Sequence, residues 1–187
     1  MFRERPLVAY RHELSLLTRN QPRVLVMRRI HPRPSVVNGY LVFSTDLRTK
    51  YGSPPPDDLL QRCPYGQPGD HLWVRERYRV EAGRVVYEYG GSTAVGGWKQ
   101  AITLPRNSCR FVLRVLSVRA VDSRFLRSQA PEISDEELLD WDRYNEIFPL
   151  CTFPWVWLLD TMHLFAGGDE ALLQGGAAAI QAEELGL

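Results

Sequence analysis

The run from Cys63 to Tyr78 constrains the fold of this chain more than any other stretch. The pairs Tyr65-Gly66 and Pro68-Gly69 both favour a reversal of the chain, because glycine adopts turn conformations that other residues avoid. After Asp70, the segment from His71 to Val80 is rich in β-branched and aromatic residues, which favour strands. The sequence therefore predicts a turn that leads directly into an uninterrupted strand.

The side chains of this predicted strand alternate in character. Successive side chains of a strand point to opposite faces, so one face is apolar with a single carboxylate and the other is basic with a single aromatic ring. The first face carries Leu72, Val74, Glu76 and Tyr78, and the second carries Trp73, Arg75, Arg77 and Arg79. An unpaired buried charge is costly, so we expect Glu76 to pair with an arginine, either as a structural anchor or as part of a site.

The composition is that of one globular domain. The chain has 187 residues and a net charge of +1, enough length to bury a sizeable core. Its positive charge is almost wholly arginine, with Lys50 and Lys99 the only lysines. Arginine binds phosphate and stacks on aromatic rings, although a GC-rich genome produces the same bias. Arginines concentrate before Pro34 and acidic residues between Glu132 and Glu146, so the basic end can meet either phosphate or the acidic segment.

The cysteines indicate a reducing compartment. Cys63, Cys109 and Cys151 lie far apart, with no Cys-x-x-Cys pair and no histidine at metal-ligand spacing near them. The N-terminal sequence has no apolar leader, and no apolar run approaches the length that spans a bilayer. We therefore expect a cytoplasmic protein without membrane contact, bound metal or cofactor.

The other patterns predict a mainly β protein with flanking helices. Helical signals cover residues 11–18 and 134–144, and a Ser-x-x-Glu capping box opens the second. Residues 165–187 are rich in glycine and alanine and predict a weak helix or frayed tail. The sequential order of about six or seven strands favours a mainly antiparallel sheet or small barrel over residues 1–164. Further strands are predicted over 23–30, 39–44, 84–89, 110–121 and 153–159, with loops over 48–56 and 90–97.

Several of these motifs resemble a group of phage and prophage proteins with an ASCH-like domain, which belongs to the PUA-like β-barrel superfamily. The specific part of the resemblance is CPYGQPGDHLWVRE, from Cys63 to Glu76. It extends over residues 4–163 and implies a pseudo-barrel of about six strands with a cleft suited to RNA or a modified nucleobase. Weaker matches lie at Glu4 to Leu7, Trp98-Lys99, Leu104 to Arg106 and Pro154 to Trp157.

Some ASCH proteins hydrolyse the acyl group of N-acetylated cytidine and carry the signature Gly-x-Lys-x-x-(Glu or Thr)-x-Arg. Here the signature aligns with Pro22 to Arg29, where Val24 replaces the lysine and Met27 replaces the acid or hydroxyl. A shift by one residue leaves Val26 at the nucleophile position. None of these side chains can attack or polarise a carbonyl, so we expect no hydrolysis of that type, and Glu76 is a catalytic candidate only if the protein is an enzyme.

The resemblance and the arginines lead to the hypothesis that the protein recognises RNA or a modified nucleotide through an Arg-rich cleft. In this hypothesis Arg28 or Arg29 either pairs with Glu76, which would lower the pKa of its carboxyl, or binds phosphate. Trp98 is the candidate for stacking on a base, because its glycine-rich loop favours exposure. The candidate binding residues are Arg23, Arg28, Arg29, Arg75, Glu76, Trp98, Lys99 and Arg106.

Two alternatives remain open at this point. In the first, a phage-derived barrel has lost its active residues and binds a host defence or nucleic-acid-processing complex through the acidic segment or the tail. In the second, the protein is an amidohydrolase acting on acylated cytidine, or a ribonuclease. Each alternative places the protein in the cytoplasm, that of the host cell if a phage encodes it.

Overall fold

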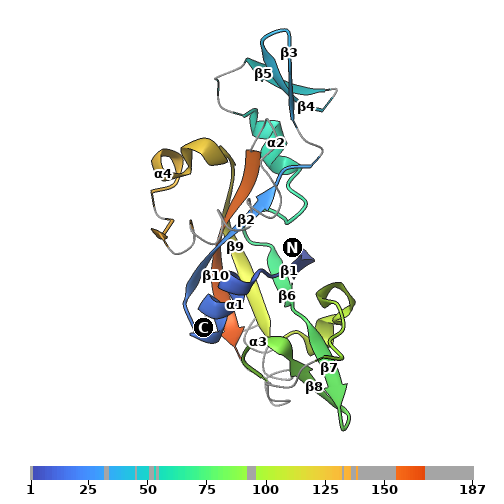
Figure 1. The fold of residues 1–187 in the computed structure, drawn as a ribbon. Helices are drawn as coiled ribbons and strands as arrows, with labels where there is room; N and C mark the ends of the chain where they lie inside the picture. Colours follow the sequence, from blue (N-terminus) through green and yellow to red (C-terminus); the bar gives the residue numbers. More distant parts are fainter. Residues whose placement is uncertain are drawn as a thin grey trace. The chain divides into compact units, whose positions relative to one another are not determined.

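A computed structural model of the chain describes residues 2–31, 34–44, 46–50, 53, 55–91, 96–131, 133–135, 138 and 155–166. Strands predominate and the helices are short, so the expected mainly β fold with helices is confirmed. No closed barrel is formed by the described strands, which make three separate sheets (Figure 1). The largest sheet has the strand order β1 (Glu4–Val8), β6 (His71–Arg75), β9 (Phe111–Asp122), β10 (Trp155–Ala166) and β2 (Arg23–Arg29).

The chain divides into two compact units, and each is described by itself. Unit 1 contains Met1–Val24, His71–Arg114 and Met162–Leu187, whereas unit 2 contains Leu25–Asp70 and Val115–Thr161. Most of the candidate binding residues therefore belong to unit 1. These are Arg23, Arg75, Glu76, Trp98, Lys99 and Arg106, while Arg28 and Arg29 belong to unit 2.

Unit 1 begins with a parallel strand pair that the sequence did not predict. β1 runs beside β6 with Glu4 opposite His71 and Val8 opposite Arg75, where the sequence had indicated only a short apolar opening over residues 7–10. β6 pairs on its other side with β9, in the antiparallel sense. The helix predicted over residues 11–18 is confirmed as α1 (Arg11–Thr18).

The predicted strand from His71 to Val80 is interrupted, so the expectation of one continuous strand was wrong. β6 ends at Arg75, and β7 (Tyr78–Glu81) begins after a two-residue break. The predicted alternation nevertheless holds across the break. Leu72, Val74, Glu76 and Tyr78 are all buried, whereas Trp73, Arg75, Arg77 and Arg79 are half-buried or exposed.

The predicted hairpin after Glu81 is confirmed. β7 pairs with β8 (Arg84–Tyr87) through a two-residue turn in which Ala82 and Gly83 have φ values of 47° and 78°. Positive φ at both turn positions is the geometry that matches the twist of the flanking strands. β8 ends before residue 89, at the short turn α3 (Glu88–Gly91). Two single-turn helices follow in unit 1, η1 (Ala101–Thr103) and η2 (Arg106–Ser108).

Unit 2 has its own apolar core and a small separate sheet. The strands predicted over 23–30 and 39–44 are confirmed as β2 and β4 (Tyr40–Ser44). The prediction of a loop over 48–56 was wrong at its start, because β5 (Leu47–Lys50) pairs with β4. β3 (Ser35–Val37) completes the three-stranded sheet, seen in Figure 1 as a compact group. The short helices of unit 2 are α2 (Asp57–Gln61), η3 (Ser123–Phe125) and α4 (Leu126–Gln129), and its core contains Leu25, Met27, Val121, Leu126, Ala130, Ile133, Val156 and Leu158.

The predicted turn after Cys63 is confirmed, and its geometry explains its residue types. The amide of Gly66 donates to the carbonyl of Cys63 at 3.3 Å, and the amide of Gln67 donates to Asp70 Oδ2 at 3.0 Å. Gly66 has a φ of 111°, and a Cβ at this position would lie 2.8 Å from Asp70 Oδ2. Only glycine satisfies both the backbone angle and the close approach of the Asp70 side chain.

The predictions for the C-terminal third are only partly covered by the described residues. The long strand predicted over 110–121 is confirmed as β9, and the last strand continues beyond the predicted range 153–159, to Ala166. The predicted helix over 134–144 and the predicted tail over 165–187 lie mostly outside the described residues. The boundary between a domain of residues 1–164 and a tail therefore stays a prediction.

Candidate functional site

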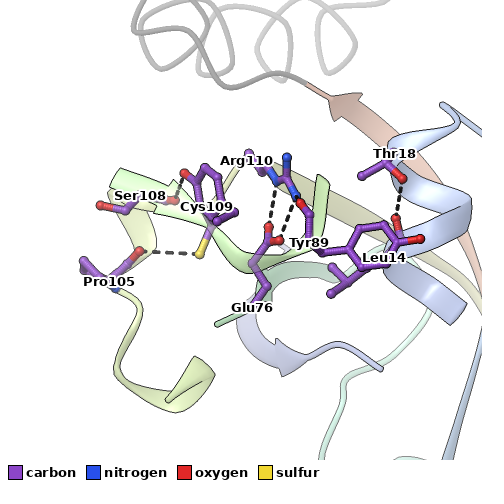
Figure 2. Close-up of polar contacts among 9 residues, drawn as sticks. Leu14, Thr18, Glu76, Tyr89, Pro105, Ser108, Cys109 and Arg110 are labelled. Atoms are coloured by element: carbon purple, nitrogen blue, oxygen red, sulfur yellow. Dashed lines mark hydrogen bonds and ion pairs between the residues drawn. The ribbon is translucent and has the colours of Figure 1, made fainter. Parts of the chain in front are cut away.

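Glu76 lies at the break between β6 and β7, with its side chain only 1% exposed. Arg110, directly before β9, donates from Nε to Glu76 Oε1 and from Nη2 to Oε2, both at 2.8 Å. Arg110 Nη2 also donates to the carbonyl of Tyr89 at 2.7 Å, so the guanidinium joins the break after β6 to the end of the β7–β8 hairpin (Figure 2). The expected arginine partner of Glu76 therefore exists, but it is Arg110 and not Arg28 or Arg29.

Aromatic rings surround the Arg110 guanidinium. Its Cζ atom lies 4.5 Å from the ring centroid of Tyr87 and 4.8 Å from that of Phe111. The Tyr87 hydroxyl donates to the carbonyl of Ser108 at 2.6 Å. Burial and the nearby charge of Glu76 raise the pKa of Tyr87 to about 12, so this phenol stays a neutral donor at physiological pH.

Burial also dominates the acidity of Glu76 itself. The loss of hydration raises the pKa of the Glu76 carboxyl, and the hydrogen bonds and charge of Arg110 offset that rise only in part. This direction is opposite to the lowered pKa expected for an arginine-paired carboxylate. The difference arises because Glu76 is almost fully removed from water, where a charge is costly even beside a cation.

Cys109 lies next to this pair but is not a nucleophile. Its thiol is buried and donates to the carbonyl of Pro105 at 3.4 Å (Figure 2). Burial raises the pKa of the Cys109 thiol to about 12, against the opposing charges of Arg106 and Arg75. A reactive cysteine needs an accessible thiolate, so Cys109 is a packing residue.

A pocket of about 830 Å³ opens beside Glu76, wholly within unit 1. This volume falls in the usual range of small-molecule sites. Part of the wall is apolar and open to solvent, since Ile102 is 60% exposed and Val8 is 42% exposed. The lining residues are Val8, Ala9, Arg11, Leu14, Glu76, Arg77, Glu88, Tyr89, Gln100, Ala101 and Ile102.

The two arginines of the pocket differ in how they are paired. Arg77 Nη1 donates to Glu88 Oε1 at 2.8 Å, so its charge is balanced at the surface. Arg11, the first residue of α1, is exposed and makes no ion pair or hydrogen bond with any described side chain. The pocket therefore combines an apolar wall, polar groups from Tyr89 and Gln100, and one available cation.

Of the eight candidate binding residues, the structure places Glu76 in this pocket. Trp98 is half-buried and stacks under the Arg79 guanidinium, whose Cζ lies 4.6 Å from the ring centroid. Lys99 Nζ lies 5.7 Å from the ring centroid of Tyr78. These contacts place Trp98 and Lys99 beside the β7–β8 hairpin and outside the pocket lining.

Two further candidates lie on the β1–β6 side of unit 1. Arg106 donates from Nε and Nη2 to the carboxylate of Glu4, at 3.1 and 3.0 Å. That pairing lowers the pKa of Glu4 below its ordinary value. Arg75 stacks on Trp73, with 4.2 Å between the Arg75 Cζ atom and the indole centroid.

The arginines of β2 do not line this pocket. Arg23 is exposed, whereas Arg28 is 5% exposed and donates from Nη1 to the carbonyl of Met27 at 2.7 Å. Arg29 is half-buried. Their expected contribution to an Arg-rich cleft around Glu76 is therefore replaced by Arg110 inside the fold and by Arg11 at the pocket.

The sequence interpretation missed Arg110, Arg11, Tyr89 and Gln100. Arg110 had a usable signal, because it directly precedes the most strongly apolar strand and a buried carboxylate requires a cation from a neighbouring element. The sequence signal for Arg11 was weaker, because it consisted only of a basic residue at the first position of a predicted helix. Tyr89 and Gln100 lie in a turn and a loop. Sequence periodicity does not predict where side chains point in such segments.

Within the part of the chain that the structure describes, no three His, Cys, Asp or Glu side chains gather as the ligands of a metal would. Among these same residues, no helix has the length and apolar character needed to cross a bilayer.

Comparison with known proteins gives no relative from which a function can be taken. None of the family models, curated proteins or solved structures compared with this chain matches it.

Proposed function

We propose that this protein binds RNA or a nucleotide with a standard or modified base through the pocket beside Glu76, without hydrolysing it. The observation that carries the proposal is the make-up of the pocket, in which an open apolar wall faces polar groups and an available arginine. A nucleotide presents the complementary groups, namely a flat base, hydrogen-bonding edges and a phosphate.

Each part of the pocket has a corresponding part of the ligand. The exposed side chains of Val8 and Ile102 can cover the face of a base, and Gln100 offers both a donor and an acceptor to its edge. Arg11 is free to donate to phosphate oxygens. Glu76 has a structural role in this proposal and does not contact the ligand, because Arg110 donates hydrogen bonds to both of its carboxylate oxygens.

The absence of hydrolysis in this proposal rests on the side chains at the expected reactive positions. Val24 and Met27 are fully buried in the apolar interior, at 0% and 1% exposure, and neither side chain can serve as acid, base or nucleophile. Cys109, which directly precedes Arg110, keeps its proton because burial raises its pKa to about 12.

Binding is tested by titrating the protein into a fluorescein-labelled RNA heptamer of mixed sequence and into labelled adenosine and cytidine monophosphates, at ~50 and ~200 mM salt. We expect salt-dependent binding. Arg11→Ala should weaken it about fivefold or more, because the variant loses one charged hydrogen bond to the ligand. Arg84→Ala is the matched control, since Arg84 is an exposed arginine of unit 1 outside the pocket.

The proposal is overturned if neither RNA nor monophosphates bind, or if Arg11→Ala and Arg84→Ala weaken binding equally. The double variant Arg28→Ala/Arg29→Ala should leave pocket binding unchanged. Incubation with N4-acetylcytidine should yield no cytidine, and turnover that disappears in Glu76→Gln would instead establish an amidohydrolase.

A further inference from the structure

One face of the β1–β6 pair carries a second feature that the pocket does not explain. Because β1 and β6 are parallel and in register, Glu4, Pro6 and Val8 lie on the same face as the neighbouring His71, Trp73 and Arg75. Glu4, Pro6 and Val8 are all exposed on this face. These six side chains form a strip along the strand pair. Its end at Val8 and Arg75 adjoins the pocket, because Val8 is also part of the pocket lining.

Arg75 stands out among the arginines near this strip. Its guanidinium makes no ion pair with any described residue and stacks on Trp73, with 4.2 Å between the Arg75 Cζ atom and the ring centroid. By contrast, the neighbouring arginines Arg77, Arg79, Arg106 and Arg110 pair with Glu88, Glu81, Glu4 and Glu76 respectively. Arg75 thus carries a positive charge that the described part of the fold leaves uncompensated.

The stacked position of Arg75 suits it to bind an anion. Stacking on an indole holds the guanidinium plane in place. Its Nε–H is buried and has no hydrogen-bond partner among the described residues. Since Arg75 is opposite Val8, the guanidinium lies on the strand pair that ends at the pocket. Arg11 supplies a second unpaired charge at the pocket itself. Among the described residues, Arg11 in the pocket and Arg75 on the strip have no ion-pair partner, and two such charges can each bind one phosphate.

We propose that the end of the strip nearest the pocket, formed by Trp73, Arg75 and Val8, is a second binding surface. It holds the nucleotide adjacent to the one in the pocket. The ligand of this protein is then a single-stranded polynucleotide rather than a free mononucleotide. This inference rests on the proposed function of the pocket. It adds a site for the next nucleotide of the same bound strand. Arg75 binds the neighbouring phosphate and offers its flat guanidinium to the neighbouring base.

The test compares ligands of different length on the full-length protein. We expect the RNA heptamer to bind at least tenfold more tightly than nucleoside monophosphates. Arg75→Gln should weaken heptamer binding about tenfold and leave monophosphate binding unchanged. The slope of log affinity against log salt should fall by about 0.7 for the lost phosphate contact. Arg75→Lys, which keeps the charge without the planar stack, should fall between the wild type and Arg75→Gln.

The control is Arg84→Gln, which removes an exposed positive charge of the same unit from β8. It should leave heptamer binding and its salt slope unchanged. Equal affinity for heptamer and monophosphate, or equal losses in Arg75→Gln and Arg84→Gln, would overturn the second surface while the pocket proposal stands. Absence of binding by both ligands would overturn the two proposals together.

Discussion

At the scale of single residues, the buried pair of Glu76 and Arg110 organises unit 1. The Glu76 side chain is 1% exposed and that of Arg110 is 15% exposed, so removal of the carboxylate leaves a guanidinium that water can hardly reach. We expect Glu76→Ala to lower the free energy of unfolding by about 3–5 kcal/mol, because it strands this charge. Urea denaturation followed by tryptophan fluorescence measures the change.

Two further variants are compared with Glu76→Ala, one at the same position and one in a surface ion pair. Glu76→Gln keeps one acceptor oxygen for the buried Arg110 guanidinium and removes the buried negative charge, so its loss should be clearly smaller than that of Glu76→Ala. Glu88→Gln removes one partner of the solvent-exposed pair with Arg77 and should cost about 1 kcal/mol or less. Equal losses in Glu76→Ala and Glu88→Gln would show that the buried pair does not stabilise the fold.

The raised pKa of Cys109 predicts a slow thiol. At pH 8, a thiol with a pKa of about 12 is deprotonated roughly a thousandfold less than one with a pKa near 9. In a Cys151→Ser background, we expect iodoacetamide to modify neither Cys109 nor Cys63 within an hour, since both are buried. Mass spectrometry of tryptic peptides identifies the modified site. The same reagent in urea should modify both cysteines rapidly, and rapid modification of Cys109 in the folded protein would contradict its buried state.

At the scale of elements, the two glycine turns around β6 and β8 differ in a way that mutation can measure. Gly83 has a φ of 78° and open space where a Cβ would be added, so Gly83→Ala should cost only the backbone strain, about 1–2 kcal/mol. Gly66→Ala adds a clash with the Asp70 side chain to the same strain, and we expect a total of about 2–4 kcal/mol. Thermal unfolding should therefore show the larger loss of stability for Gly66→Ala. A smaller loss at Gly66 than at Gly83 would contradict the close approach of Asp70.

The strands could be predicted where a local pattern determined them, and the connections between strands could not. Alternation of buried and exposed side chains predicted the faces of residues 72–79 correctly, because that pattern depends only on the local backbone period. The break after Arg75 was not predicted, since Glu76 and Arg77 have no Gly or Pro to mark it. The break coincides with a long-range contact that no local pattern encodes, because the Glu76 carboxylate accepts hydrogen bonds from Arg110.

The parallel pairing of β1 was also beyond the reach of local reasoning. Its buried residue is Leu7, and Pro6 at its centre reads as a strand breaker. In the structure β1 is an edge strand of the described sheet, where proline is tolerated because its missing N–H removes no ladder hydrogen bond on the unpaired side. The pocket depends on this strand, so a site that includes Val8 and Arg11 could not be assembled from the sequence alone.

At the scale of the whole molecule, two carboxyl groups give the stability opposite dependences on pH. Burial raises the pKa of Glu76, so on raising the pH the unfolded chain loses this proton first. Its stabilising contribution is therefore complete below the ordinary carboxyl pKa of 4.5 and declines as the pH rises through the folded-state pKa. Arg106 lowers the pKa of Glu4, whose contribution is present above 4.5 and is lost as the pH falls through its own lower value.

These opposite signs can be separated by difference measurements on Glu76→Gln and Glu4→Gln. The stability of the wild type minus that of Glu76→Gln should decline as the pH rises above about 4.5, because glutamine does not titrate. The same difference for Glu4→Gln should decline as the pH falls below that value. Urea midpoints between about pH 3 and pH 8 provide both curves. If the Glu76→Gln difference instead grew with pH, the charge and hydrogen bonds of Arg110 would outweigh the burial of the carboxyl in setting its pKa.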